Sequence, residues 1–279
     1  MTAASLRMPR RDPVAGFGLS LGVTLLWLTA IVLVPLLALV LRPWEIGVSG
    51  VLASLAEPRV LAALRLSFGA AFLATLCNLP LGLLLAWVLV RYRFPGRRLM
   101  DAVVDLPFAL PTAVAGLALT ALFATNGWLG APLAMLGIKV AFTPLGVIVA
   151  MAFVGLPFVV RTVEPVLRDL PLEAEEAAAT LGATRPQVLR RVVLPALAPA
   201  LLTGFGLSLA RAVGEYGSVI FIAGNMPMVS EIAPLLIVTR LEQFDYAGAA
   251  AIGLAMLLIS FAVLLCLNLA QRWLRRGRR

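Results

Sequence analysis

The sequence predicts an all-α, polytopic membrane protein with six transmembrane helices. Of its 279 residues 61% are hydrophobic and only 13% are charged, too few to cover the surface of a water-soluble domain. The mean hydropathy is +1.00. Apolar stretches long enough to cross a bilayer recur along the whole chain, and arginine-rich segments alternate with them.

Six apolar stretches approach or exceed the roughly 20 residues that a helix needs to cross the hydrocarbon core. They run approximately over residues 17–41, 64–90, 102–124, 143–163, 196–223 and 247–270. The first stretch is too long for the apolar part of a signal peptide and no small-residue cleavage site follows it, so we expect a retained anchor rather than a cleaved leader. The predicted organisation is a tail at 1–16, a single transmembrane domain at 17–270 and a basic tail at 271–279.

The arginines indicate how the chain is oriented in the membrane. Segments rich in arginine follow every second stretch, whereas the intervening loops carry few basic residues; the rich segments are 7–11, 91–98, 161–191 and 272–279. Because cytoplasmic loops carry the excess of Lys and Arg, both termini and the loop at 164–195 are predicted to face the cytoplasm. The net charge of +9 then favours contact with anionic membrane lipid, and no nucleic-acid partner is expected.

Composition argues against several classes of function. The chain has no histidine, which excludes His-based metal sites and general bases, and both cysteines lie inside apolar stretches as small hydrophobic residues. Lys139 is the one lysine and lies in an outward loop, which disfavours an intramembrane enzyme with a Ser–Lys dyad. A phosphate loop of the form G-x-x-x-x-G-K-[ST] is missing, so a self-sufficient ATP-driven pump is disfavoured as well. We expect no metal and no cofactor in this chain.

The loop at 164–195 carries the most specific pattern in the sequence. Its core matches E-A-A, three residues, Gly, nine residues, an aliphatic residue, one more residue, then Leu-Pro; the matching residues are Glu176, Ala177, Ala178, Gly182, Val192, Leu194 and Pro195. Pro171 suits the first turn of a helix, and Ala174, Ala177, Ala178 and Leu181 would share one small, apolar face. Gly182 predicts a left-handed stop, and Thr184 predicts the cap of a second helix that Arg190 and Arg191 close.

This pattern resembles the cytoplasmic docking loop (EAA loop) of the membrane subunits of binding-protein-dependent ABC importers. Further segments are similar to the permeases of sulfate and molybdate importers: Arg91-Tyr-Arg-Phe-Pro-Gly96, Asp105-Leu-Pro-Phe-Ala-Leu-Pro-Thr-Ala-Val-Ala-Gly116 and Gly214-Glu-Tyr-Gly217. Phe221-Ile-Ala-Gly-Asn225 and Arg240-Leu-Glu-Gln-Phe-Asp-Tyr246 narrow the likeness to sulfate/thiosulfate importer permeases of the CysT type. A molybdate/tungstate importer permease is the alternative.

The resemblance implies a type I ABC importer permease fold in the bacterial inner membrane. It implies three kinds of protein partner: two copies of an ABC ATPase that binds ATP and Mg, a homologous second permease subunit, and a periplasmic sulfate/thiosulfate-binding protein. The residues that would dock on the ATPase are Glu176, Ala177, Ala178, Leu181, Gly182, Leu194 and Pro195. A passive channel, the remaining rival, would not need such a loop.

Charged residues in or beside the apolar stretches are further candidate functional residues. Arg211 and Glu215 lie four residues apart in the fifth stretch. They are either part of a translocation pathway or a structural ion pair, and we favour the structural ion pair. Asp101 and Asp105 are expected to be solvated or paired with arginines such as Arg97 and Arg98, rather than catalytic.

An outward loop supplies the last candidate surface. Arg240, Glu242 and Asp245 lie there beside Phe244 and Tyr246, either as a contact for the binding protein or as a solvated loop. Prolines inside the stretches fit both a tightly packed, kinked bundle and hinges for motion.

Overall fold

The computed structural model describes residues 17–276, and every regular element in this range is a helix or helical turn. The predicted tail at 1–16 and the last three residues of the tail at 271–279 lie outside the described residues. The helices are α1 (Phe17–Leu28), α2 (Val34–Leu41), α3 (Gly47–Ala56), α4 (Pro58–Arg91), α5 (Arg97–Ala109), α6 (Thr112–Phe123), α7 (Gly130–Met135), α8 (Pro144–Asp169), α9 (Leu172–Thr180), α10 (Arg185–Val188), α11 (Leu194–Val213), α12 (Val219–Ile222), α13 (Ala233–Glu242) and α14 (Tyr246–Arg276).

Three shorter turns join some of these helices without a break. A π-helical turn, η1 (Thr29–Leu33), links α1 to α2, and a second, η3 (Leu189–Val193), links α10 to α11. The 3₁₀ turn η2 (Arg42–Ile46) links α2 to α3. Both π-helical turns come directly before a proline at the first or second position of the next helix, where the missing N–H disturbs the regular hydrogen-bond pattern.

Five continuous helical segments are long and apolar enough to cross a membrane. They are Phe17–Ala56, Pro58–Arg91, Pro144–Asp169, Arg185–Val213 and Tyr246–Arg272. The third predicted span, 102–124, is instead two helices, α5 and α6, bent by 116° at a short break. The break falls at Leu110-Pro111, where the proline forces the residue before it into an extended conformation with ψ of 136°. The six predicted spans therefore correspond to five continuous helical segments and one sharply bent pair.

The fifth predicted span also ends earlier than expected. Helix α11 stops at Val213 rather than continuing to residue 223, and a turn leads into the short helix α12. The buried carboxylate of Glu215 accepts hydrogen bonds from the backbone N–H and the side-chain hydroxyl of Ser218, at 2.9 and 2.8 Å. The first of these bonds satisfies a backbone donor at the start of α12, as the side chain of an N-cap does, which favours a turn over a continued helix.

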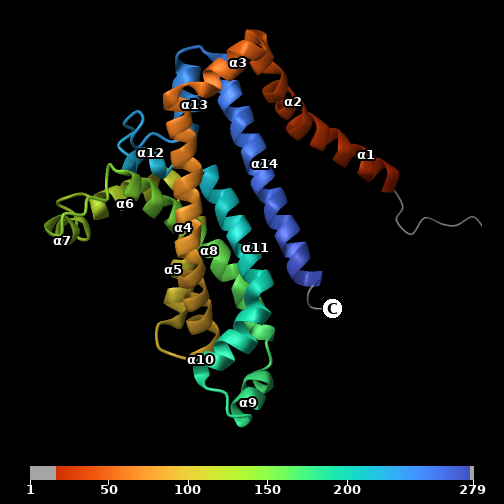
Figure 1. Ribbon diagram of the computed structural model, residues 1–279, viewed down its shortest axis with the longest axis vertical. Helices are drawn as coiled ribbons and strands as arrows, with labels where there is room; N and C mark the ends of the chain where they lie inside the picture. The colour runs from red at the N-terminus through yellow and green to blue at the C-terminus, as the bar shows by residue number, and fades with distance from the viewer. Residues whose placement is uncertain (1–16, 277–279) are drawn as a thin grey trace, which may run out of the picture.

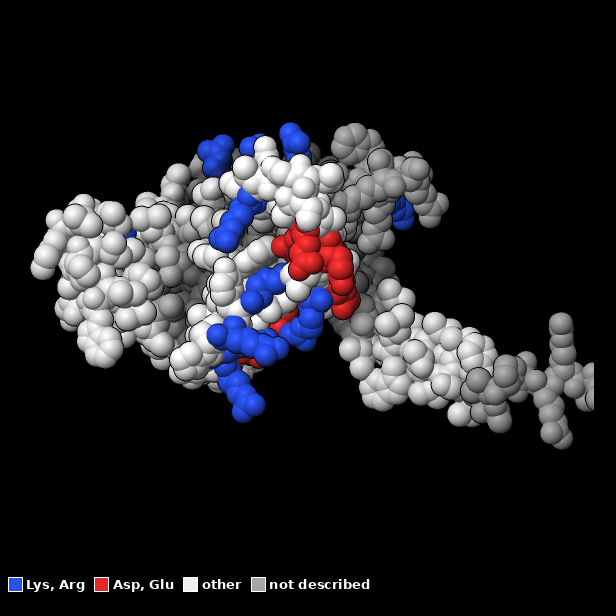
Figure 2. Space-filling model, turned by 90° about the horizontal axis from the view of Figure 1, so that it is seen from below, with Lys and Arg blue, Asp and Glu red and all other residues white. Residues whose placement is uncertain are grey.

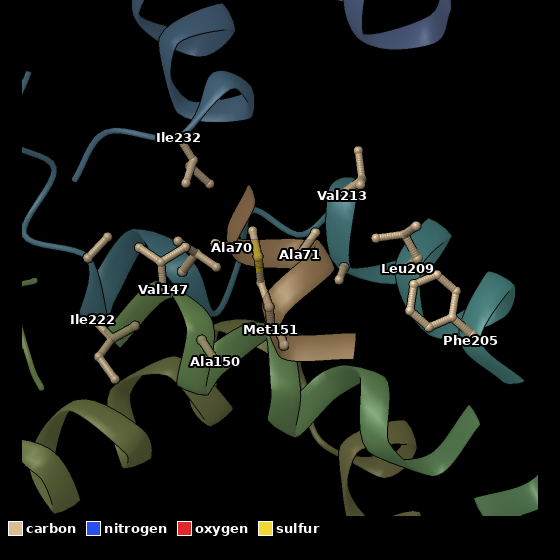
Figure 3. Packing of buried hydrophobic residues seen from close by; sticks show 14 residues of the cluster. Ala70, Ala71, Val147, Ala150, Met151, Phe205, Leu209, Val213, Ile222 and Ile232 are labelled. Atoms are coloured by element: carbon tan, nitrogen blue, oxygen red, sulfur yellow. The ribbon is translucent and has the colours of Figure 1, made fainter. Parts of the chain in front are cut away.

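Helices α4, α8 and α11 form the centre of the molecule, with α14 against α11 (Figure 1). Their contact is built from small and larger apolar residues, among them Ala70 and Ala71 of α4, Met151 of α8 and Leu209 of α11 (Figure 3). Asn78, which is buried, donates to the carbonyl of Ala152 at 2.9 Å and so ties α4 to α8 by a polar link inside the bundle. Small residues and occasional polar links are how helices associate where lipid replaces water.

The N-terminal helices α1 and α2 project away from this centre, whereas α9 and α10 occupy one end of the molecule and α3 and α13 the other (Figure 1). No side chain of α1, η1 or α2 is buried, and large apolar groups such as Trp27 are exposed. At the α3 end, Arg59 of α4 donates both a 2.8 Å Nε and a 2.8 Å Nη bond to the carboxylate of Glu231. This bidentate pair fixes the segment between α12 and α13 to the start of α4.

Candidate functional site

The loop with the E-A-A pattern folds as a helix, a glycine turn and a second helix, as its sequence predicts. Helix α9 carries Glu173 and Glu175 in its first turn, where the positive end of the helix dipole favours carboxylates. Gly182 has a φ of +85°, in the left-handed region. Its N–H donates to the carbonyl of Ala179 at 2.9 Å, and the N–H of Ala183 donates to that of Ala178 at 3.1 Å. These two bonds are those of a Schellman motif, which ends a helix and redirects the chain.

The second helix differs from the expectation in its extent. Thr184 begins it, with its N–H donating to the side-chain oxygen of Gln187 at 2.7 Å, and Pro186 lies in the first turn. The helix does not end at Arg190 and Arg191, however, but runs on through η3 into α11 as one segment, Arg185–Val213. Movement of this part of the loop would therefore be carried directly into α11.

The predicted docking residues fall into two groups. Glu176, Ala177, Leu181 and Gly182 are exposed at the tip of the loop with Ala178 beside them, and the side chain of Leu181 is 88% exposed. Viewed toward this end, acidic and basic side chains gather on the surface (Figure 2). Leu194 and Pro195 are partly buried in the first turn of α11 instead, so they belong to the stem of the loop and not to its exposed surface.

An ion pair that the sequence did not reveal joins this loop to the bundle. Nη2 of Arg91, the last residue of α4, lies 2.5 Å from Oε1 of Glu175 on α9. The Arg91 guanidinium also lies over the ring of Trp87, 5.7 Å from its centroid. The two charged residues are 84 positions apart in the chain, and no local pattern links positions so distant.

A cavity of about 1030 Å³ lies between the end of α4 and the loop. Its α4 wall is apolar and includes Pro80, Leu83 and Leu84, and its loop wall includes Leu189 and Val193. Arg91 and Glu175 are also part of the lining. The cavity thus separates α9 from α4, whereas the stem of the loop at Val193 packs in one hydrophobic cluster with Leu89 of α4.

Arg211 and Glu215 form the ion pair that the sequence allowed, with Nη1 and Oε2 2.5 Å apart. Glu215 is almost fully buried, but it lies in the turn beyond α11 rather than on the helix itself. The Arg211 side chain keeps 34% of its surface exposed, so the pair has one buried and one accessible member. This geometry fits a packing role and leaves the guanidinium able to meet an anion.

Asp101 and Asp105 of α5 are paired with Arg161 of α8, not with Arg97 or Arg98 as expected. Arg161 lies 2.8 Å from Asp101, 2.6 Å from Asp105 and 2.6 Å from Glu164. One guanidinium thus holds three carboxylates and clamps the broken helix pair to α8. Arg97 and Arg98 are nearer in sequence to the two aspartates, whereas folding brings Arg161 closer in space.

Arg240, Glu242 and Asp245 were expected in a loop, but α13 extends to Glu242 and contains the first two. Arg240 binds Glu57 and lies 3.0 Å from Asp245, whose carboxylate also accepts the N–H of Gly248 at 2.9 Å. These contacts use two of the three residues to join α3, α13 and α14. Glu242 alone of the three is exposed without an ion pair among the described residues.

Comparison with known proteins agrees with this architecture. A family model described as "Binding-protein-dependent transport system inner membrane component" matches residues 78–279. The chain is 51% identical to the sulfate transport system permease protein CysT of Salmonella typhimurium, over 98% of both chains. It is also 51% identical to the Escherichia coli protein of the same name, over 96% of each.

Solved structures share the fold at much lower identity. A bacterial ABC transporter that imports the acidic polysaccharide alginate matches with a TM-score of 0.74 and 16% identity, covering 92% of this chain and 96% of that one. The MetNI methionine ABC transporter, in inward-facing conformations, matches with a TM-score of 0.52 and 22% identity over 79% of this chain and 94% of that one. The chain therefore has a type I ABC importer permease fold.

Proposed function

We propose that this chain, which belongs to the family of inner membrane components of binding-protein-dependent transport systems, is the permease subunit of an ABC importer for sulfate and thiosulfate. One observation carries the proposal: the chain and a sulfate permease are 51% identical over 98% of both lengths. The substrate therefore follows from the relatives, while the mechanism follows from the geometry of the loop.

The energy for transport would come from a pair of ATPase subunits, which bind ATP and Mg²⁺ in place of this chain. The exposed tip of the loop, with Glu176, Ala177, Ala178 and Leu181, offers them a short helix with small side chains. A small apolar face allows another protein to approach the helix backbone closely. Leu194 and Pro195, set back in α11, would support the tip rather than touch the ATPase.

A second, homologous permease would complete the pore, and a periplasmic binding protein would deliver the anion. The exposed apolar surface of α1 and α2 requires lipid or another subunit around it, which fits a chain that works inside a larger membrane complex. The distribution of arginines supports an orientation with the α9–α10 end and both termini in the cytoplasm.

Two groups of charged residues are candidates for contact with the anion or with the binding protein that delivers it. Arg211 would attract a passing dianion while Glu215 limits how tightly it is held, since a pore must release its cargo. Arg240 and Asp245 are engaged within the chain, so Glu242 is the better-placed member of that group for contact with a binding protein.

The proposal is tested by transport in proteoliposomes that contain the permease pair and the ATPase with which it purifies. Uptake of radiolabelled sulfate should require ATP inside, the binding protein outside, and hydrolysis that rises when loaded binding protein is added. Unlabelled thiosulfate should compete more strongly than molybdate or tungstate. Stronger competition by molybdate or tungstate would replace the proposed substrate, and ATP-independent uptake would indicate a passive channel.

A further inference from the structure

Helix α4 differs from its two main partners in how it is joined to the loop. Helix α8 passes directly into α9 through Leu170 and Pro171, and α10 passes into α11 as a continuous helix. Helix α4 ends at Arg91 and has no such connection, because the chain then leaves for α5. A movement of the loop reaches α8 and α11 along the backbone, and α4 is packed against both, but α9 can act on α4 directly only through a side-chain contact.

The ion pair between Arg91 and Glu175 provides that connection. Among the described residues it is the one side-chain hydrogen bond between α9 and a helix that crosses the membrane. The side chains are mostly enclosed, with 14% of Arg91 and 20% of Glu175 exposed, so water screens the pair less than it screens a surface pair. The adjoining cavity leaves little other packing between α9 and α4 that could transmit a displacement.

The side chain of Arg91 is oriented for this contact by a neighbour on its own helix. Its guanidinium lies over Trp87, one turn earlier on α4, and its Nε is enclosed without a hydrogen-bond partner. The stacked, planar group therefore has a restricted set of orientations, and Glu175 fixes one end of it. The neighbouring Glu176 also borders the cavity, but it is exposed and makes no ion pair among the described residues, so of these two glutamates Glu175 is the one tied to α4.

We infer that Arg91 and Glu175 are positioning residues for energy coupling, which make α4 move with the ATPase-docking loop. The inference rests on the proposed importer function and adds to it a second route of transmission, beside the backbone connections to α8 and α11. It assigns adjacent glutamates different tasks: the exposed Glu176 would remain available to the ATPase, and Glu175 would bind Arg91.

The test uses the complete complex in lipid nanodiscs and proteoliposomes, with Arg91→Gln, Glu175→Gln and the double charge reversal Arg91→Glu/Glu175→Arg. Both single variants should retain the ATPase through purification and hydrolyse ATP at the basal rate. The anion transported per ATP should fall by roughly threefold to tenfold, the range expected when one link of a coupled network is cut. The charge reversal should return this ratio to within about twofold of the wild type.

Arg93→Gln and Glu173→Gln are the matched controls, since both residues are exposed near the same two helix ends and make no ion pair among the described residues. They should leave the ratio unchanged. Spin labels on α4 and on α9 should report an ATP-dependent distance change that grows in Arg91→Gln, because α4 follows α9 less closely without the direct contact.

The results separate the two proposals. A wild-type complex that shows no ATP-dependent transport and no nucleotide-dependent change in distance overturns the importer function, together with the inference built on it. A wild-type complex that transports normally while both single variants keep the wild-type ratio overturns the inference alone. Loss of coupling that the charge reversal fails to restore also overturns it.

Discussion

Gly182 is the residue whose conformation decides where the docking helix ends. Its φ of +85° lies where a residue with a Cβ is strained, and β-branched residues are strained most. A Cβ built there would meet nothing within 4 Å, so the strain of a substitution would come from the backbone alone. A substitution at Gly182 therefore tests the backbone conformation without a clash between side chains.

Gly182→Val should uncouple transport from hydrolysis. Holding valine in the left-handed region costs about 1–3 kcal/mol, which favours a different turn and displaces α9. Gly182→Asn is the control, since asparagine tolerates this conformation. Sulfate uptake and ATP hydrolysis measured in parallel should show a large loss of uptake for valine and a small loss for asparagine. Normal uptake by the valine variant would contradict the role given to this turn.

At the scale of the helices, the bundle depends on close approach between α4, α8 and α11. Gly155 of α8 lies where these three meet, beneath a buried polar cluster of Asn78, Ser208 and Thr75. A Cβ on Gly155 would lie 2.4 Å from Oγ of Ser208 and 3.0 Å from Nδ2 of Asn78. Neither group has room to withdraw, because both are buried.

Gly155→Ala should destabilise the protein by about 1–3 kcal/mol through overpacking of this crossing. Gly206→Ala on α11 is the matched change, since its nearest neighbour would be Leu267 Cδ1 at an ordinary 3.6 Å. Thermal unfolding in nanodiscs should give a lower Tm for the first variant and a nearly unchanged Tm for the second. Equal Tm values for the two variants would show that the crossing is looser than these distances indicate.

The whole molecule is polarised, with the loop that would meet the ATPase at one end and the α3–α13 region at the other (Figure 1). Arginines predict that the loop end lies in the cytoplasm. Two exposed side chains mark the two ends: Leu181 on the loop is 88% exposed, and Glu242, the last residue of α13, is exposed at the other end. The free cysteines Cys77 and Cys266 are exposed as well and must be removed before labelling.

In a background without native cysteines, Glu242→Cys should react with a membrane-impermeant maleimide on intact spheroplasts. Leu181→Cys should react only after the membrane is opened, because its side of the bilayer is sealed. The labelled fraction is read by mass shift on a gel. Reaction of Leu181→Cys in intact spheroplasts would invert the orientation and remove the ATPase from reach of the loop.

Features that depend on neighbours in the chain could be predicted from the sequence. The left-handed Gly182 and the helix start at Thr184 follow from local residue preferences. Features that depend on distant residues could not. Pairing of Arg161 with Asp101 and Asp105, and of Arg91 with Glu175, joins positions that only folding brings together. The sharp bend at Leu110-Pro111 could not be predicted from hydropathy, because hydropathy is averaged over a window of residues and does not report the direction of the helix axis.

The sequence by itself determined that this chain is a membrane protein, roughly where its apolar spans lie, and how the loop with the E-A-A pattern turns. Those properties follow from the transfer of apolar side chains into lipid and from backbone preferences, both of which act locally. Only the tertiary structure decided that one predicted span is a broken pair, that α10 runs into α11, and which charges meet. Electrostatic partners and packing contacts are chosen by distance in space, and hydropathy along the chain does not measure that distance.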